Sequence, residues 1–231
     1  MIKAVLTIDD VVTANTPALV DYLLEKGIVA LMFAQGEHLE KYPENAIYAL
    51  QHGMIVGNHS YSHPNFAEIS FGKGIEEIEK TDELLDEIYK KAGVERKYKP
   101  FRFPYGSKGG DNKEKYEQYF RDKSFSKLDD REITCQWWKD NGLDKDIDTF
   151  WTFDFAEYRI RPDSEFTMDD VFKRVHDSNP SSGGVLLEDG TKHIILMHDH
   201  EETLACVPDY YKIMIGHILE CGVTLEQPTF I

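Results

Sequence analysis

The sequence predicts an α/β fold built on a parallel sheet, either open or closed into a barrel. Short apolar stretches of strand length alternate with amphipathic helical stretches along most of the chain. The first stretch, residues 2–8, is almost wholly apolar, as is typical of a strand that is buried on both faces. Polar clusters follow several of these strands, at the edge where such folds gather their ligands.

The first half of the chain alternates regularly. Strands are expected at 2–8, 28–34, 54–58 and 99–103, and helices from Thr16 to Gly27, at 43–53 and at 71–92. Thr16 followed by Pro17 marks a helix start, because a proline at the first helical position lacks only an N–H that would be unpaired there. The charged face of the helix at 71–92 is interpreted as a solvated surface.

The second half is less regular. A strand is expected at 151–160 and another at 193–197, with helices at 113–125, 168–177 and 207–221. The stretch 107–111 is rich in glycine but lacks the Gly-Lys-Ser/Thr of a phosphate loop, so it predicts a turn. Turns around a short strand are expected at about 181–190. Because no linker or repeat is visible, we expect one domain spanning residues 1–231.

The composition excludes several classes of partner. The 231 residues include 42 acidic and 26 basic side chains, which gives a formal charge of −16. Broad surfaces that bind DNA, RNA or anionic lipid depend on lysine and arginine, so none is expected here.

The cysteines and the hydropathy pattern suggest a location. Cys135, Cys206 and Cys221 are odd in number and widely spaced, which favours reduced thiols in a reducing compartment. The chain shows neither the core of a signal peptide nor an apolar stretch long enough to form a transmembrane segment. The expected location is therefore cytoplasmic.

Two histidines lie in the stretch His-Ser-Tyr-Ser-His-Pro at 59–64, directly after the third expected strand. Imidazoles four residues apart can face the same way, and neutral imidazole is a common ligand for zinc. Pro64 disfavours the α region for His63, so a loop is expected rather than a helix. Alone, such a pair is also compatible with an ordinary surface loop.

Four further polar clusters accompany this pair. They are Asp9-Asp10, Arg102-Phe103-Pro104-Tyr105-Gly106, Asp154-Phe155-Ala156-Glu157-Tyr158 and Leu196-Met197-His198. Together with 59–64, they resemble the motifs T-F-D-D, H-S/T-x-x-H-P, R-x-P-Y-G, D-x-x-D-W and L-x-H of the polysaccharide deacetylase family. This is carbohydrate esterase family 4, which includes the nodulation-type chitooligosaccharide deacetylases and the peptidoglycan deacetylases. The resemblance covers residues 7–198 and implies a distorted (β/α) barrel of seven strands.

The resemblance also implies a metal-dependent amide hydrolase. Asp10, His59 and His63 supply two imidazoles and a carboxylate, a set that leaves coordination positions open, and we expect them to bind a divalent metal. Zinc is expected, and cobalt, manganese or nickel would suit the same ligands. By the resemblance Asp9 is the general base and Asp10 the ligand, whereas the spacing alone does not distinguish these two aspartates.

Further catalytic roles follow from the resemblance. Arg102 would pair with the base and keep it ionised. The backbone N–H of Tyr105 would donate to the oxyanion. His198 would protonate the departing nitrogen, with Glu157 orienting its ring and Asp154 as the alternative partner.

Two departures from the motifs concern the substrate. Val11 replaces a glycine and is expected to alter the loop beside the metal. Glu157-Tyr158 replaces Asp-Trp and changes one wall of the groove, where Tyr105 and Tyr158 are expected to contact substrate. The expected function is removal of N-acetyl groups from an amino sugar. The alternatives are a deformylase or a non-sugar acylamine hydrolase on the same fold, and a catalytically silent binding module.

The expected substrate is a cytoplasmic N-acylated sugar, either small or linked to a carrier as a glycan precursor. A carrier phosphate would need local positive charge, for which Lys108 and Arg159 are the candidates; both are equally compatible with ordinary surface roles. The pair Trp137-Trp138 is interpreted as core packing rather than a sugar platform. The other histidines are interpreted as ordinary, with His200 in an exposed loop; the rest are His38, His52, His176, His193 and His217.

Overall fold

The computed structural model describes all 231 residues. Its strands are β1 (Ile2–Val11), β2 (Leu31–Ala34), β3 (Ile55–Asn58), β4 (Phe153–Asp154), β5 (Lys192–His198) and β6 (Val223–Leu225). All pairings are parallel, in the order β3-β2-β1-β5-β4, and β6 pairs with the start of β1. The α/β class and the parallel sheet expected from the sequence are confirmed.

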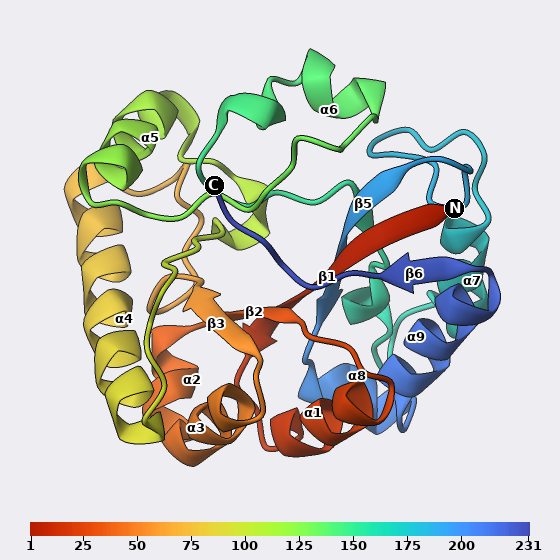
Figure 1. Ribbon diagram of the computed structural model, residues 1–231, viewed down its shortest axis with the longest axis horizontal. Helices are drawn as coiled ribbons and strands as arrows, with labels where there is room; N and C mark the ends of the chain where they lie inside the picture. Colours follow the sequence, from red (N-terminus) through yellow and green to blue (C-terminus); the bar gives the residue numbers. More distant parts are fainter.

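Helices surround these strands (Figure 1). They are α1 (Thr16–Glu25), α2 (Gly36–Lys41), α3 (Pro43–Gln51), α4 (Phe71–Ala92), α5 (Lys113–Asp122), α6 (Gln136–Asp140), α7 (Met168–Val175), α8 (Glu201–Cys206) and α9 (Tyr210–Glu220). Short 3₁₀ turns lie at Pro104–Gly106, Gly110–Asn112, Leu143–Lys145 and Glu157–Arg159. No helix combines the length and the apolar character that a membrane span requires.

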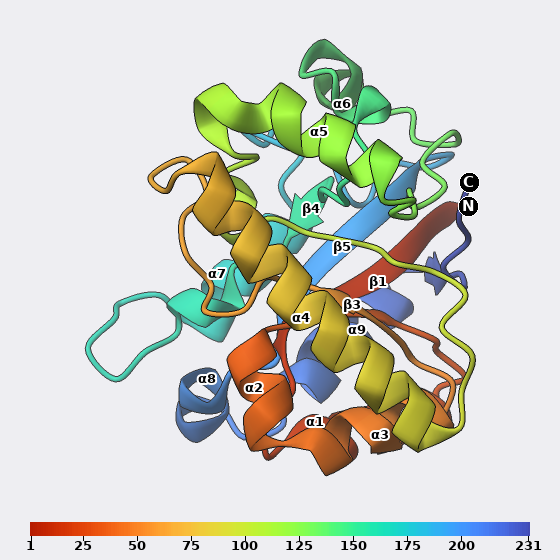
Figure 2. The same ribbon diagram turned by 90° about the vertical axis from the view of Figure 1, so that its left-hand side faces the viewer.

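The ends of the long helix α4 agree with the sequence. The Ser70 hydroxyl accepts from the backbone N–H of Lys73, and Gly93 ends the helix in the left-handed conformation that glycine tolerates best. Figure 2 shows α4 and α5 crossing one side of the molecule. Between these helices and the sheet lies an aromatic cluster that contains Phe66, Phe101, Phe103, Tyr116 and Phe120.

Three strand expectations were wrong. Residues 99–103 form no strand, because their only ladder contact is a single bridge between Phe101 and Asn58. In the stretch 151–160 only Phe153–Asp154 pairs, since the chain then turns through a 3₁₀ segment. No strand forms at 181–190. Helices α2, α6 and α8 and strand β6 were not expected, and each is too short to leave a clear periodic pattern.

Irregular backbone joins the two edges of the sheet. Phe101 bridges to the end of β3, and the backbone N–H of Thr149 donates to the carbonyl of Phe101 at 2.8 Å. The chain then enters β4, which pairs with β5. Six strands plus this one bridge agree with the distorted (β/α) barrel of seven strands that was expected, although strand pairing does not close it all round.

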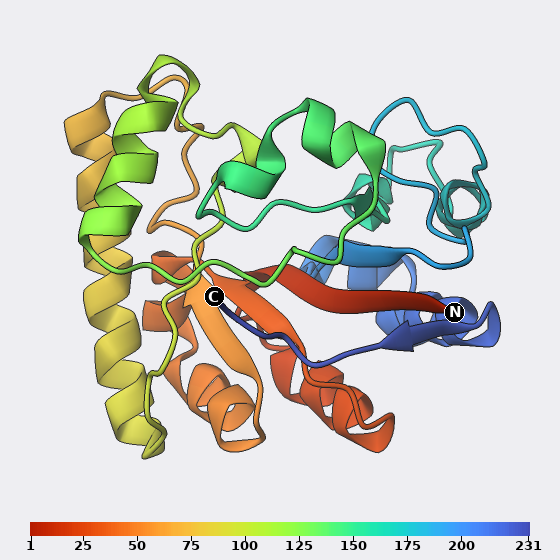
Figure 3. The same cartoon turned by 45° about the horizontal axis from the view of Figure 1, so that its top comes forward.

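Two layers of buried side chains flank the sheet. The main core lies towards α1, α3 and α9, and a smaller one lies beside α6. Figure 3 shows α6 and its flanking loops on the side of the sheet away from α1 and α3. All parallel strands end at one edge of the sheet, and β1, β3 and β5 deliver there the polar motifs that follow them.

Candidate active site

The end of β1 places two consecutive aspartates on one rim. The register of β1 against β2 shifts between Ile8 and Val11, and Asp10 has a φ of +62°, a conformation that aspartate tolerates better than most residues. Both carboxylates therefore line the same cavity instead of pointing to opposite faces. The side chain of Val11 is fully buried in the main core, and its effect on the loop beside the site stays a prediction.

The loop after β3 brings two imidazoles to the same rim. His59 Nδ1 donates to the Arg102 carbonyl at 2.8 Å, which leaves Nε2 as the nitrogen that faces the aspartates. Nε2 of His59 lies 3.8 Å and Nε2 of His63 3.5 Å from Oδ1 of Asp10. The loop conformation expected before Pro64 is confirmed, with His63 at a φ of +56°.

These three side chains fit a divalent metal. The ligand atoms of Asp10, His59 and His63 all lie within 4.8 Å of one another. One carboxylate and two imidazoles suit zinc and its neighbours and leave coordination positions for water and substrate. The donor set expected from the sequence is thus assembled at one point of the fold.

Glu77 holds the histidine loop from α4 and was not expected from the sequence. Its side chain is buried, and Oε2 accepts from the backbone N–H groups of Tyr61 at 3.1 Å and Ser62 at 2.7 Å. The Ser62 hydroxyl donates to the same carboxylate. The sequence did contain an indication that Glu77 is buried, because this residue falls on the inner stripe of the helix together with Ile78 and Thr81.

Two more unexpected contacts fix Asp10. The Gln35 amide donates to Oδ1 at 2.7 Å, and Nδ1 of His38 donates to the Asp10 carbonyl at 2.9 Å. His38 is therefore a neighbour of the site rather than an ordinary histidine. Burial alone would raise the pKa of Asp10, but the imidazoles of His198, His59 and His63 and the Gln35 amide hold that pKa well below its usual range.

Asp9 has a different partner. Nη1 of Arg102 donates to Oδ1 of Asp9 at 2.7 Å, and both side chains are almost completely buried. Arg102 is itself anchored by the carbonyl of Thr149, which accepts from Nε at 2.9 Å. Oδ2 of Asp9 lies 3.5 Å from Nε2 of His59, which places it beside the metal-ligand set.

His198 lies across the cavity with Glu157 behind it. Nδ1 of His198 donates to Oε1 of Glu157 at 3.1 Å, and the backbone N–H of His198 donates to the same carboxylate. Burial opposes the charged imidazolium, but Glu157, with Asp10 and Asp9, outweighs it and raises the pKa of His198 to about 10. Asp154 accepts instead from the backbone N–H of Ala156. Of the two candidate partners, Glu157 is the one that contacts the ring.

Two tyrosines form the outer wall. The ring of Tyr105 packs 4.6 Å from that of His63, and the ring of Tyr158 packs 4.8 Å from that of His198. Tyr105 has a φ of +58°, and no acceptor in the protein takes its backbone N–H. That N–H is available to a substrate oxygen.

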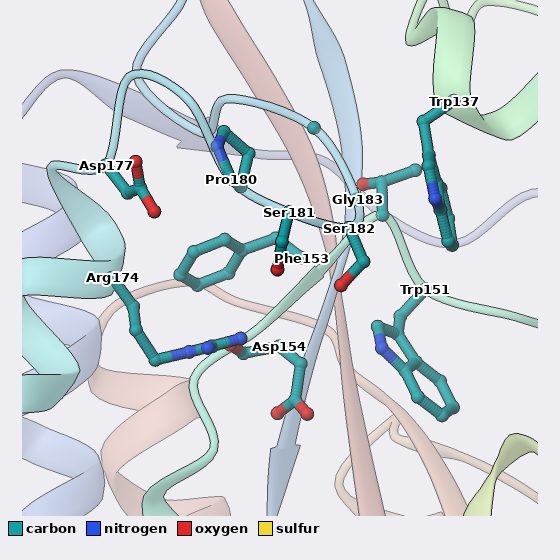
Figure 4. A pocket seen from close by; sticks show the side chains of 12 residues that line it. Trp137, Trp151, Phe153, Asp154, Arg174, Asp177, Pro180, Ser181, Ser182 and Gly183 are labelled. Atoms are coloured by element: carbon teal, nitrogen blue, oxygen red, sulfur yellow. The ribbon is translucent and has the colours of Figure 1, made fainter.

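One cavity of about 500 Å³ unites these groups. Its lining includes Asp9, Asp10, Gln35, His59, His63, Tyr105, Trp151, Asp154, Tyr158, Arg161, His198 and His200. A second cavity of about 230 Å³ adjoins it, because Trp151 and Asp154 line both. Figure 4 shows Trp137 and Trp151 on one side of this second cavity and Arg174 on the other. Trp138 is core, as expected, whereas Trp137 is not fully buried and reaches the cavity.

Several other expectations require correction. Lys108 is no free cation, because Nζ lies 2.9 Å from Asp146 and 2.5 Å from Asp148. Arg159, the other candidate cation, is exposed and lies over the ring of Phe166, so its role stays a prediction. His200 is half-buried, lines the cavity and contacts Arg161, so it is not in an exposed loop.

The remaining histidines divide into two groups. His52 contacts the Tyr48 carbonyl, and the buried His193 contacts the hydroxyls of Thr152 and Thr191. His176 and His217, for which no partners were expected, contact each other at 3.0 Å between their Nε2 atoms.

Comparison with known families agrees with this geometry. The family model described as polysaccharide deacetylase matches residues 2–120, which carry Asp9, Asp10, His59, His63, Arg102 and Tyr105. The chain belongs to the polysaccharide deacetylase family.

Named members of the polysaccharide deacetylase family match part of the chain. A peptidoglycan-N-acetylglucosamine deacetylase of Bacillus cereus is 36% identical over 91 residues, which are 39% of this chain and 31% of that protein. A chitooligosaccharide deacetylase of Azorhizobium caulinodans is 30% identical over 93 residues, 40% of this chain and 42% of that protein. The matches thus span less than half of these relatives.

Solved structures extend the likeness to the whole fold. The crystal structure of the Bc1960 peptidoglycan N-acetylglucosamine deacetylase superposes with a TM-score of 0.66 over 97% of this chain and 85% of that one. At 21% identity this likeness establishes the fold alone. It extends well beyond residue 120, where the family model ends, into the part of the chain that carries Glu157 and His198.

Proposed function

We propose that the protein is a metal-dependent N-deacetylase, which hydrolyses the acetamide of an amino sugar to acetate and a free amine. One observation carries this proposal. A single cavity joins the Asp10, His59 and His63 ligand set to the pair of Asp9 with Arg102 on one side and to His198 with Glu157 on the other. Amide hydrolysis needs an activated water, a stabilised oxyanion and a proton for the leaving nitrogen.

Asp10, His59 and His63 would hold the metal, and zinc suits them first, with cobalt, manganese or nickel as alternatives. When bound, the metal would polarise the acetyl carbonyl and make the attacking water more acidic. Gln35 and Glu77 support this set, because each fixes a ligand or the loop that carries it.

Asp9 would act as the general base. Its carboxylate is held in position by Arg102, and it takes a proton from water as a carbon–oxygen bond forms. The backbone N–H of Tyr105 would donate to the carbonyl oxygen as negative charge develops there.

His198 would complete the reaction. The imidazolium, stabilised by Glu157, donates its Nε2 proton to the nitrogen as the carbon–nitrogen bond breaks. The amine then leaves as the sugar product, and acetate remains on the other side of the broken bond.

The substrate class is an N-acetylated amino sugar within a glycan. The names of the relatives, a peptidoglycan-N-acetylglucosamine deacetylase and a chitooligosaccharide deacetylase, support this class. The adjoining cavity offers room for a neighbouring sugar, with Trp137 and Trp151 as apolar faces. A carrier-linked precursor loses its support from Lys108, whose charge is neutralised, and it stays a sequence-based prediction, as does the cytoplasmic location.

The test is acetate release from matched concentrations of N-acetylglucosamine, its oligomers, peptidoglycan fragments and nucleotide-linked N-acetyl sugars. We expect turnover that increases from the single sugar to the oligomers and that chelation abolishes. His63→Ala is the inactive control, and Glu165→Gln, an exposed change outside the cavity, is the active one. Formate release from N-formyl analogues without acetate release would identify a deformylase instead.

The silent binding module predicts a different result. Such a protein would bind the oligomers with no release of acetate, and His63→Ala would leave that binding unchanged. Acetate released from non-sugar acetamides in preference to every sugar would identify the acylamine hydrolase. Either result would overturn the proposal.

A further inference from the structure

A second set of metal-binding side chains lies on α9 and at the end of α7, outside both cavities described above. Nε2 of His176 lies 3.0 Å from Nε2 of His217, and Sγ of Cys221 lies 3.8 Å from the same His217 nitrogen. The three ligand atoms all lie within 4.8 Å of one another. Two imidazoles and a thiol therefore converge on one point.

The fold explains why they meet. His217 and Cys221 are four residues apart at the end of α9, so they lie one above the other on the same face. His176 directly follows α7, which packs against α9. The ring of Phe172 contacts that of His217, with centroids 4.3 Å apart, and limits how the imidazole turns.

The surroundings favour a cation. Residues at the end of a helix face the negative end of its dipole, and this position suits positive charge. His176 is exposed, and His217 and Cys221 are half-buried, so a metal has access from solvent. Without a metal, the two Nε2 atoms form a hydrogen bond in which one imidazole must donate to the other.

We propose that His176, His217 and Cys221 form a second divalent-metal site, distinct from that of Asp10, His59 and His63. Two imidazoles and one thiolate are a borderline-to-soft donor set that selects zinc-like cations and leaves a fourth position for water. The thiol loses its proton when the metal binds. The site ties the end of α7 to α9, and α7 leads directly into the 177–184 segment that lines the second cavity.

The two sites differ in one spectroscopic respect. Only the second contains sulfur, so a thiolate-to-cobalt charge-transfer band in the near ultraviolet reports on it alone. The experiment titrates metal-free, reduced protein with cobalt and records this band. We expect it to saturate at one cobalt per chain, in a protein that binds two cobalt ions in all.

Variants separate the sites. Cys221→Ser should abolish the band and keep acetate release, whereas His59→Ala should keep the band and lose acetate release. His176→Ala changes an exposed side chain and should weaken cobalt binding at the second site by about tenfold or more. A loss of this size follows even when a residue that only supports a metal ligand is removed. Circular dichroism checks that each variant is folded.

Three results would overturn the proposal. The first is that wild-type protein shows no band. The second is that the band survives in Cys221→Ser and disappears in Cys135→Ser. The third is that the band disappears in His59→Ala while that variant is folded. Because the band and the acetate assay are independent, failure of this site leaves the proposed deacetylase function untouched, and the reverse also holds.

Discussion

Arg102 and Asp9 form a buried ion pair in which Nη1 of the arginine lies 2.7 Å from Oδ1 of the aspartate. The next residue, Asp10, faces both histidines. The pair makes two adjacent and chemically identical side chains unequal. Asp9 pairs with the guanidinium and lies close to His59 alone, whereas Asp10 lies close to both imidazoles and accepts from the Gln35 amide. Breaking such a buried pair by removing one charge costs about 3–5 kcal/mol, so variants at Asp9 preserve the shape of the side chain and are checked for folding by circular dichroism.

The first prediction separates these roles. Asp9→Asn should retain the metal but lower kcat by about 10²-fold or more, because the amide no longer accepts a proton from water. Asp10→Asn should instead weaken metal binding, since a neutral oxygen replaces a charged ligand. Metal content and acetate release are measured on the same samples. The roles are reversed if Asp9→Asn loses the metal and Asp10→Asn keeps it.

The second prediction concerns the pH dependence of His198. Glu157 raises the pKa of His198 towards about 10, and a general acid loses activity as pH rises through its pKa. Glu157→Gln keeps the shape and an acceptor for the backbone N–H, but removes the charge. The alkaline limb of the kcat profile should therefore move down by about one pH unit or more. Glu165→Gln is the control, and an unmoved limb would show that His198 is not the titrating acid.

The motif residues could be predicted because each motif is contiguous, and those that carry Asp10, His63 and His198 lie at the end of a buried strand. Parallel strands bring their carboxyl ends to one edge, so the order of motifs sufficed to gather Asp10, His63 and His198. The roles of Asp9 and Asp10 could not be read from spacing. They depend on the shifted register of β1 and on the left-handed backbone at Asp10.

The supporting residues were harder to predict. Gln35 and His38 lie at the start of α2, which follows β2. They reach Asp10 only because β2 pairs with β1 in the folded sheet, so no local sequence pattern marks them. Glu77 carried a signal, because a carboxylate on an apolar stripe must find buried donors. The strand expected at 99–103 does not form, although its local sequence pattern is typical of a strand. Its strand-like sequence is real, but its one neighbour, β3, offers a single bridge at Phe101.

The third prediction tests the carboxylate of Glu77. Glu77→Ala leaves two backbone N–H groups and the Ser62 hydroxyl without their acceptor, so the histidine loop should loosen. Supporting residues of this kind typically change metal affinity by about 10–100-fold, and we expect a loss in that range. Glu76→Ala, an exposed neighbour on α4, is the matched control. Equal cobalt affinity in the two variants would assign Glu77 a purely structural role.

The last prediction concerns a buried carboxyl remote from the chemistry. Glu117 on α5 is 2% exposed and lies beside Asp148 and Asp146. Lys108 pairs with both aspartates, and Lys113 also pairs with Asp146. Burial, followed by the charge of Asp148, raises the pKa of Glu117 from 4.5 to about 8. The folded chain therefore holds a proton between these two pH values that the unfolded chain has lost. Its free energy of unfolding must fall as pH rises through this window.

Glu117→Gln removes this proton difference while an oxygen still accepts the backbone N–H of Ile147, which donates at 2.8 Å. Between pH 6 and 8 the wild type should lose about 1–2 kcal/mol more unfolding free energy than the variant, since each pKa unit corresponds to about 1.4 kcal/mol. Urea unfolding at pH 6, 7 and 8 measures the difference, with exposed Glu114→Gln as control. Parallel pH curves for wild type and Glu117→Gln would mean that Glu117 is ionised in the folded protein, with Arg121, whose Nη1 lies 3.9 Å away, as its partner.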